Sequence, residues 1–247
     1  MFKDTVCITY NSPTHERFQQ NFQSLYGDLF YKYIPYKMED IKKTDFYNDW
    51  PKIFKYEKYF GYFLWKPYII GHTIDLYPDK TILYCDSNFR FNPIQFEEVF
   101  SNTYKNNGNT FLIKCFNFLN KEWTKRDAFI LMDADSERYW NANQIWSSCM
   151  GFGYTNRNEQ LLMEYILNCI NENILTELPN TCGKDNLPEF VAHRWEQSIM
   201  SILVEKYNIG GIWDTQITGI VDKVYDEELL SYKQEIDKDP LKENEDV

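Results

Sequence analysis

The sequence predicts a single-domain α/β protein in which helices flank a central, mainly parallel β-sheet. The chain opens with a strand–helix–strand pattern, and further apolar strand-like runs follow at 81–85 and 110–116. Helices with one apolar face are then indicated at 160–170 and 196–207. A length of 247 residues fits one domain of this kind.

The elements of the first half can be placed in order. A β-branched run at 4–10 indicates a strand, and Thr14 after the following turn is expected to cap a helix. A second strand is expected at 29–36. Pro67 suits the first turn of a helix, because its missing N–H is not needed there. The run 81–85 predicts a buried strand that ends in polar residues.

The second half contains one ambiguous segment. The apolar residues of 123–140 fit either a helix or a strand, whereas 110–116 indicates a strand. Helical spacing recurs at 160–170 and 196–207, and the pair Gly210–Gly211 is expected to end the last helix.

Composition excludes one class of partner and sets the domain boundary. The net charge of -11 argues against a nucleic-acid binder, which needs clustered basic residues. Residues 222–247 hold 10 acidic and 4 basic side chains, so we expect a domain over 1–221 and a flexible acidic tail over 222–247. Aromatic residues make up 18% of the chain and offer either stacking surfaces for flat ligands or a Tyr-rich core.

The cysteines and the hydropathy pattern indicate the compartment. The six cysteines are widely spaced and form no CxxC pair, so we expect reduced thiols and no structural zinc. The start of the chain shows no signal-peptide pattern, and no apolar run is as long as a membrane span requires. These features predict a cytoplasmic protein without a membrane span.

The first candidate site is Asp86-Ser87-Asn88, which directly follows the strand 81–85. Ligands of open parallel sheets bind beyond the carboxyl ends of strands. A carboxylate there can hold a ribose hydroxyl, or a Mg²⁺ or Mn²⁺ ion that bridges a diphosphate. The alternative is a polar turn without a ligand.

The second candidate is Asp133-Ala134-Asp135, which is the only literal Asp-x-Asp of the chain. Two carboxylates at this spacing suit a divalent metal. The same residues also suit the end of a helix, where Asp side chains cap and turn the backbone.

Two further segments carry charge at expected helix starts. Lys66 precedes Pro67 and can place a cation beside phosphates near exposed backbone N–H groups. His193 can bind a metal or a phosphate, Arg194 can clamp phosphates, and Glu196 can act as a base on a hydroxyl. The alternatives are a surface lysine on a turn and a charged helix entry.

Three blocks of the sequence resemble a family of polysaccharide-type glycosyltransferases with a GT-A-like fold, found in bacteria and large DNA viruses. The block "YFGYFLWKPYIIGHTID…TILYCDSN" is similar to the family's "GGYWLWKPYIILKTL…DILLYLDAG". The block "EWTKRDAFILMDADSERYW" is similar to "WTKRDLF…MDCDSPEYW", and "PEFVAHRWEQSIMSIL" is similar to "F..HRHDQSILSLL". The blocks occur in the same order and span about residues 59–207.

The resemblance implies a GT-A-like (Rossmann-like) domain with a nucleotide-sugar-binding half at about 1–115 and an acceptor half at about 116–221. The expected activity transfers a sugar from a nucleotide-sugar, with UDP favoured and GDP next, to a hydroxyl of a glycan or glycoconjugate. The donor-binding residues are then Thr9, Lys66, Asp86, Asn88, His193 and Arg194. The metal ligands for Mn²⁺ or Mg²⁺ are Asp86, Asn88 and His193. The catalytic candidates are Glu196, Asp135 and Asp133, and the acceptor-side residues are Trp123, Asp127, Gln144 and Trp195.

Departures from the family pattern leave alternatives open. Asn88 stands where the GT-A Asp-x-Asp has a second carboxylate, so the metal is bound weakly or not at all. Trp195 and Glu196 replace a His and an Asp of the family block. One alternative is an inactive homologue that binds a sugar or nucleotide. Another is a metal-dependent phosphoesterase that uses Asp133 and Asp135.

Overall fold

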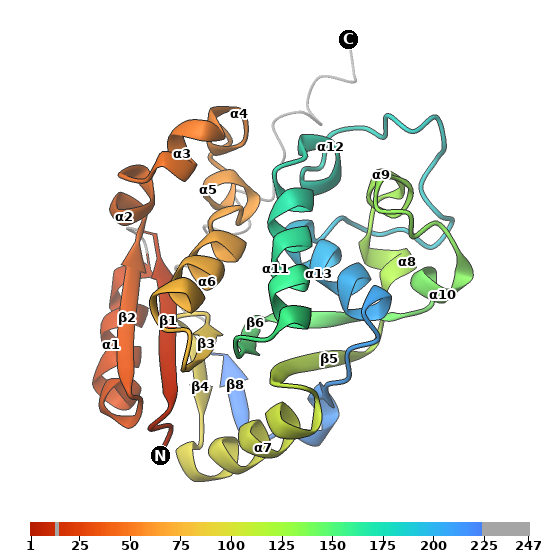
Figure 1. Ribbon diagram of the computed structural model, residues 1–247. Coiled ribbons are helices and arrows are strands. Elements are labelled where there is room, and N and C mark those ends of the chain that lie inside the picture. Colours follow the sequence, from red (N-terminus) through yellow and green to blue (C-terminus); the bar gives the residue numbers. More distant parts are fainter. Residues whose placement is uncertain (13–14, 224–247) are drawn as a thin grey trace.

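The computed structural model describes residues 1–12 and 15–223 and has an α/β fold (Figure 1). Six strands form one sheet in the order β2-β1-β3-β6-β5-β7, and β4 and β8 form a separate pair. The strands are β1 (Thr5–Asn11), β2 (Lys32–Lys37), β3 (Thr81–Cys85), β4 (Phe89–Phe91), β5 (Thr110–Leu119), β6 (Asn143–Phe152), β7 (Ile212–Trp213) and β8 (Val221–Lys223).

The helices vary from single turns to fourteen-residue rods. Before β5 they are α1 (Glu16–Tyr26), α2 (Met38–Lys42), α3 (Asp45–Asp49), α4 (Pro51–Phe54), α5 (Tyr59–Tyr62), α6 (Trp65–Leu76) and α7 (Pro93–Asn106). After β5 they are α8 (Asn120–Trp123), α9 (Arg126–Leu131), α10 (Glu137–Trp140), α11 (Asn156–Cys169), α12 (Glu172–Leu175) and α13 (Trp195–Lys206). The short 3₁₀ turns are η2 (Gly27–Leu29) and η3 (Asp214–Gln216).

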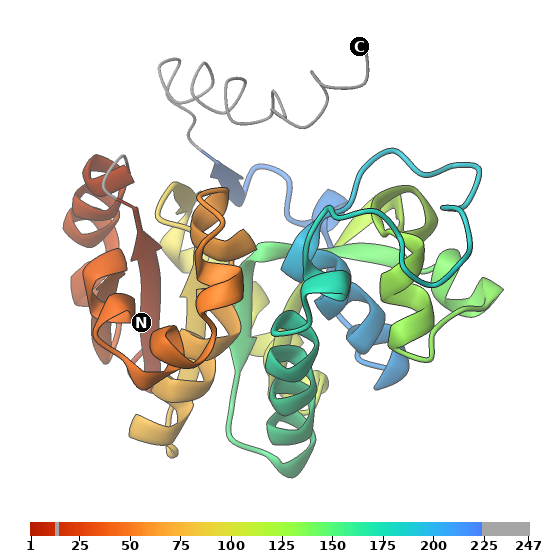
Figure 2. The ribbon, with the colours of Figure 1, turned by 90° about the horizontal axis from the view of Figure 1, so that it is seen from above.

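The six-stranded sheet is mainly parallel, as the sequence predicts. Strand β1 is parallel to β2 and to β3, and β7 is parallel to β5. Strand β6 is antiparallel to both of its neighbours, β3 and β5. Five of the six strands therefore run in one direction, and their carboxyl ends define one edge of the sheet, which Figure 2 views from above.

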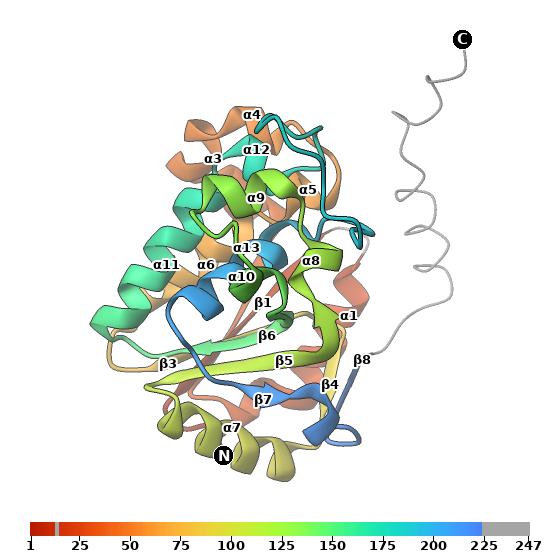
Figure 3. The ribbon, with the colours of Figure 1, turned by 90° about the vertical axis from the view of Figure 1, so that its right-hand side faces the viewer.

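Helices cover both faces of the sheet and create two cores. Side chains alternate across a strand, so Val6 and Ile8 of β1 enter one core while Cys7 between them enters the other. Helices α6, α11 and α13 cover the first face, and α1 and α7 cover the second (Figures 1 and 3). Because the central strands β1, β3 and β6 are buried on both sides, the site at the sheet edge rests on a rigid base.

The two-stranded sheet extends the domain beyond its expected boundary. Strand β8 pairs antiparallel with β4, with Phe89 opposite Lys223 and Phe91 opposite Val221. Asp222 and Lys223 therefore belong to the fold and not to a tail. The rest of the expected tail, 224–247, and the expected cap Thr14 lie outside the described residues.

Three local predictions are resolved or corrected. The ambiguous segment 123–140 contains helices α9 and α10, and β6 was not predicted at all. Helix α13 ends at Lys206, before the pair Gly210–Gly211. The residue with left-handed φ after this helix is Asn208, at 50°, so it takes the place expected of glycine.

A left-handed turn leads into α6. Five consecutive residues from Tyr59 to Phe63 have φ between 50° and 74°, and only Gly61 among them adopts this region without strain. Backbone hydrogen bonds hold the turn, including Gly61 N–H to Tyr56 O at 2.9 Å and Lys66 N–H to Phe63 O at 2.8 Å. The turn therefore orients the first residues of α6, which carry Lys66.

All six cysteines are free thiols, and Cys85 and Cys149 lie opposite each other on β3 and β6 with their sulfurs 3.6 Å apart. Within the described residues, no helix has the length and apolar character needed to cross a membrane.

Candidate active site

Asp86 occupies the carboxyl end of β3, as the sequence predicts, and its carboxylate has two protein partners. Oδ1 accepts a hydrogen bond from the Tyr84 hydroxyl at 2.7 Å, and Oδ2 accepts one from Lys223 Nζ at 2.9 Å. Its backbone N–H donates to Ser148 O on β6 at 2.8 Å. Burial alone would raise the pKa of Asp86, but the charges of Lys223 and Lys66 and these hydrogen bonds hold it well below its usual value. Asp86 is therefore an anion that cations surround.

A buried cluster of Lys66, Glu196 and Ser147 lies next to this carboxylate. Lys66 Nζ donates to Glu196 Oε1, and Ser147 Oγ donates to the same oxygen at 2.9 Å. The side chains of Lys66 and Glu196 are only 3% and 2% exposed. The rings of Phe63 and Tyr84 lie 4.9 and 5.1 Å from Lys66 Nζ. Lys66 is therefore a counter-ion within the site and not the exposed phosphate contact that we predicted.

Residues with left-handed φ and contacts between aromatic rings hold Lys66 and Glu196 next to each other. Lys66 follows the turn that ends at Phe63, and Glu196 follows Trp195, whose φ is 49°. The ring of Trp195 lies 4.8 Å from that of Tyr59 and 5.9 Å from that of Phe63. The start of α6 and the start of α13 are thus joined, which holds the ammonium and the carboxylate at one place.

Arg194 provides a cation without an opposing charge among the described residues. Its guanidinium lies 4.5 Å from the centre of the Trp123 ring and makes no hydrogen bond or ion pair within 1–12 and 15–223, and its Nε is buried. Burial, and next the charge of Asp214, raise the pKa of Cys115 to about 12, while the charges of Lys223 and Arg194 act in the opposite direction. Both cations therefore lie near the Cys115 thiol on β5.

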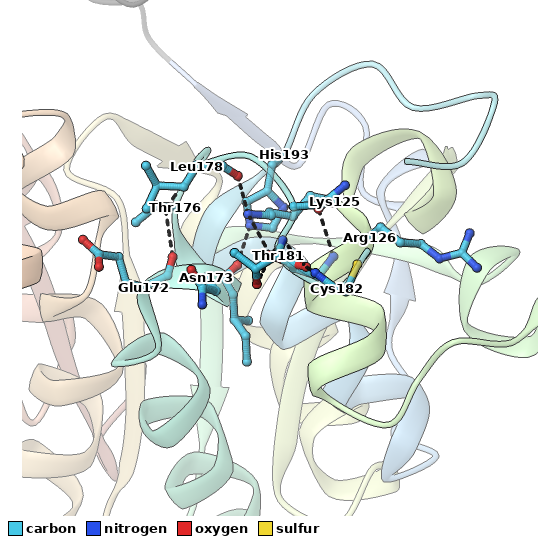
Figure 4. A network of polar contacts seen from close by, with 12 residues as sticks. Lys125, Arg126, Glu172, Asn173, Thr176, Leu178, Thr181, Cys182 and His193 are labelled. Carbon is cyan, nitrogen blue, oxygen red and sulfur yellow. Dashed lines mark hydrogen bonds and ion pairs between the residues drawn. The ribbon is translucent and has the colours of Figure 1, made fainter. Parts of the chain in front are cut away.

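His193 does not have the predicted metal-binding or donor-binding role. Its Nε2 lies 2.9 Å from Ile174 O, and its Nδ1 accepts a hydrogen bond from the backbone N–H of Lys125 at 3.3 Å (Figure 4). Burial, and next the charge of Lys125, lower the pKa of His193 to about 3. A neutral imidazole whose two nitrogens are both engaged thus connects helix α12 to the start of α9.

The three aspartates of the middle block also have structural partners. Asp127 accepts hydrogen bonds from the backbone N–H groups of Thr181 and Cys182 at 2.8 to 3.0 Å, so it anchors a loop and does not line an acceptor site. Asp135 pairs with Arg126 at 3.0 Å and with Lys184 at 3.1 Å.

Asp133 is exposed and adopts a φ of 54° just after α9, which is a helix-terminating position. With Asp135 held by two cations, the described structure does not arrange these two carboxylates as a metal pair or as free bases.

Two other predicted site residues lie inside the fold. Thr9 is fully buried, and its hydroxyl bonds to Tyr33 Oη at 2.7 Å and accepts from Gln19. Gln144 is also fully buried, and its side chain bonds to Asn120, Thr124 and Gln197. Because these polar groups satisfy each other, neither side chain is available to a donor or an acceptor.

The predicted aromatic residues remain partly accessible. Trp123 stacks on the exposed Phe118, with ring centres 4.8 Å apart, and Arg194 lies on its ring. Trp195 donates through Nε1 to Glu177 Oε1 at 3.1 Å and joins the aromatic cluster of the left-handed turn. The acceptor-side role stays a prediction for both.

The predicted metal ligands do not fit a divalent ion in this geometry. Both oxygens of Asp86 already accept hydrogen bonds, one of them from an ammonium, and both nitrogens of His193 are engaged. Within 1–12 and 15–223, no three or more His, Cys, Asp or Glu side chains gather in a way that could hold a metal. Half-buried Asn88 alone would add only an amide oxygen.

Sequence reasoning missed Tyr84, Ser147 and Lys223. Lys223 lies 137 residues from Asp86 and within a run dominated by acidic residues, so only the pairing of β8 with β4 reveals its position. Tyr84 and Ser147 occur in strands, where a polar side chain has no signal that separates a site residue from a core residue.

Comparisons with known proteins give only distant likenesses. No family model matches the chain, and no match was found among curated proteins. The fold is similar to the crystal structure of a glycosyltransferase involved in the glycosylation of the major capsid of PBCV-1, with 10% identity, a TM-score of 0.38, and coverage of 76% of this chain and 80% of that one. It is also similar to mouse xyloside xylosyltransferase 1 in its apo form, with 10% identity, a TM-score of 0.42, and coverage of 85% and 84%. Scores this low do not assign a function to this chain.

Proposed function

We propose that the protein is a glycosyltransferase that moves a hexosyl or pentosyl group from a nucleotide-sugar to a hydroxyl of a glycan or glycoconjugate. The observation that carries this proposal is the ionised Asp86 at the carboxyl end of β3. It lies beside Lys223 and beside the ion pair of Lys66 with Glu196. Two of the three sequence blocks that resemble a glycosyltransferase family contain Lys66, Asp86 and Glu196 and support the same function.

The proposed reaction is a displacement at the anomeric carbon. The bond from this carbon to the diphosphate oxygen breaks, its electron pair leaves with the nucleotide, and the acceptor oxygen forms the new bond. Cations beside the leaving diphosphate stabilise the charge that builds up on it, and they do so most strongly where water is excluded. UDP-sugars are the favoured donors and GDP-sugars come next.

Glu196 is the candidate for the acceptor's proton if the reaction inverts configuration. Its Oε1 is engaged by Lys66 and Ser147, whereas its Oε2 makes no hydrogen bond with a described residue. In a retaining reaction the same carboxylate would stabilise positive charge on the sugar ring. Asp135 is not proposed as the base, because Arg126 and Lys184 both pair with its carboxylate.

Donor turnover tests the proposal directly. The purified protein is incubated with UDP-, GDP- and dTDP-sugars, each with and without a panel of glycan acceptors, and released nucleotide is measured together with the thermal shift. We expect release from one donor class, lost in Asp86→Ala and kept in Asp79→Ala, whose carboxylate is exposed at the surface.

Two other results would replace the proposal. Binding of a nucleotide without release under any acceptor condition would favour an inactive binding homologue, which the full engagement of Asp86 would explain. Phosphate release from a sugar-free ester, lost in Asp133→Ala, would favour the phosphoesterase alternative. Absence of both binding and release would sink the transferase proposal.

A further inference from the structure

The ammonium of Lys223 has unused hydrogen-bonding capacity beside Asp86. An ammonium carries three N–H donors. One of them donates to Asp86 Oδ2 at 2.9 Å, and no other described polar group accepts from Lys223 Nζ, which lies 5.6 Å from the ring of Trp146. The Lys223 side chain is 15% exposed, so a ligand at the sheet edge can reach it.

Arg194 makes no ion pair with a described residue, and its buried Nε has no hydrogen-bond partner. Its charge and that of Lys223 both lower the pKa of Cys115, against burial and the charge of Asp214, so the residue before α13 and the end of β8 both lie near this thiol. A partly buried guanidinium without an anionic partner is costly, because burial removes water that would otherwise solvate it. An anionic ligand that bridges Lys223 and Arg194 would remove this cost.

A divalent metal does not suit the same position. Lys223 Nζ occupies the place beside Asp86 Oδ2 where a cation would bind, and the ammonium would repel a second positive charge. Lys66 adds a further cation close enough to lower the pKa of Asp86. Lysine and arginine therefore supply the positive charge that a metal supplies in other phosphate sites.

We infer that Lys223 and Arg194 bind the diphosphate of the donor directly, without a divalent metal, while Asp86 positions the Lys223 ammonium. This inference rests on the proposed function, because the diphosphate is that of the nucleotide-sugar. It assigns β8 a role in the site, since this strand delivers Lys223. It also explains why a chain with Asn88 in place of a second carboxylate retains a cationic site.

Inorganic pyrophosphate tests the inference apart from sugar transfer. Its binding to the full chain is measured by titration calorimetry in EDTA, and again in Mn²⁺. We expect wild-type binding to persist in EDTA, and Lys223→Ala and Arg194→Ala each to weaken it by about tenfold to a hundredfold, as loss of a charge-assisted hydrogen bond does. Lys223→Arg should stay within a few fold of wild type.

Lys206→Ala is the matched control. Lys206 pairs with Glu164 at 2.8 Å at the far end of α13 from Arg194, so this change should leave pyrophosphate binding unaltered. Far-ultraviolet circular dichroism checks that each variant is folded. EPR spectra of added Mn²⁺, recorded without any phosphate, should be the same for wild type and Asp86→Asn, because Asp86 binds no Mn²⁺ ion.

The results separate the two proposals. No pyrophosphate binding in EDTA, binding that appears only with Mn²⁺, or binding unchanged in Lys223→Ala would overturn the metal-free site. Lys223-dependent pyrophosphate binding without turnover of any nucleotide-sugar would keep the anion site and refute the glycosyltransferase.

Discussion

At the scale of single residues, the pair Lys66–Glu196 shows how a buried charge is tolerated. Both side chains are almost fully buried, so each would be costly without the other. Ser147 donates to the shared oxygen, and aromatic rings surround the ammonium. The pair is therefore a position where removal of one charge should be far more harmful than at the surface.

Glu196→Gln should lower the free energy of unfolding by about 3 kcal/mol or more, because Lys66 keeps its charge and loses its counter-ion. Urea unfolding at pH 7 measures this. In contrast, Lys206→Ala removes a partly exposed ion pair and should change stability by less than about 1 kcal/mol. Equal losses in the two variants would contradict the buried pair.

His193 should make stability depend on pH. Its pKa is lowered from 6.5 to about 3 in the folded chain, so between these values the unfolded state binds more protons than the folded state. Stability is therefore lost as pH falls below about 6.5, by about 2 kcal/mol between pH 7 and pH 5. Urea unfolding of His193→Gln should lack this part of the pH dependence, whereas exposed His72→Gln should retain it.

Three candidate residues whose positions in the fold agree with the sequence prediction share a simple signal. Asp86 follows an apolar strand, and Lys66 and Glu196 lie at helix starts, so local patterns position all three. The roles predicted for His193, Asp127 and Gln144 were wrong because these side chains bond to loop amides, a helix carbonyl and polar side chains that lie 19 or more residues away in the sequence. A sequence does not show whether a polar side chain faces a ligand or a distant backbone.

At the scale of elements, the left-handed turn from Tyr59 to Phe63 concentrates strain directly before the ion pair. Four residues other than glycine adopt this conformation, each at a cost of about 1 kcal/mol or more. The aromatic contacts with Trp195 and the backbone hydrogen bonds of the turn offset that cost. The strained backbone therefore lies where the start of α6 contacts the start of α13.

Gly61→Ala should destabilise the protein by about 1–2 kcal/mol, since φ is +74° and an added Cβ would lie 3.2 Å from Ile53 O. The control is Gly71→Ala, in the middle of α6, where an added Cβ meets nothing within 4 Å. This change should be neutral or stabilise by up to about 1 kcal/mol. Thermal unfolding measures the Tm of both variants. A lower Tm for Gly61→Ala and an equal or higher Tm for Gly71→Ala would confirm the left-handed turn at Gly61, and a lower Tm for both would refute it.

The elements differ in how well the sequence predicts them. Strands β1 and β3 are apolar runs of β-branched and other large residues, and period and composition identify them. Strand β6 contains two serines, an asparagine and a glycine, and its burial comes from neighbours on both sides. For the end of α13, Asn208 replaced the expected glycine, because asparagine also tolerates a left-handed φ.

At the scale of the whole molecule, the candidate site joins four distant parts of the chain. Lys66 comes from α6, Asp86 from the end of β3, Glu196 from α13, and Lys223 from β8. The fold class follows from alternating strands and helices, but the meeting of these parts depends on the reversed direction of β6 and on the pairing of β4 with β8. Neither feature has a local sequence signal.

A pair of truncations tests the contribution of β8. A chain that ends at Lys223 keeps every contact invoked for the site, so it should bind pyrophosphate as the full chain does. A chain that ends at Ile220 lacks Lys223 and the buried Val221, and its affinity should fall by about tenfold or more. Titration calorimetry compares the two, and equal affinities would show that β8 has no part in the site.

The position of β8 also has a consequence for biosynthesis. A chain leaves the ribosome from its amino terminus, and β4 is made long before its partner strand. Asp86 and the Lys66 segment therefore emerge without the cation that completes their surroundings, because Lys223 is made 137 residues after Asp86. A nascent polypeptide that stops short of β8 would contain the six-stranded sheet and both flanking layers of helices, yet it could not engage an anionic ligand through Lys223 until β8 had docked on β4.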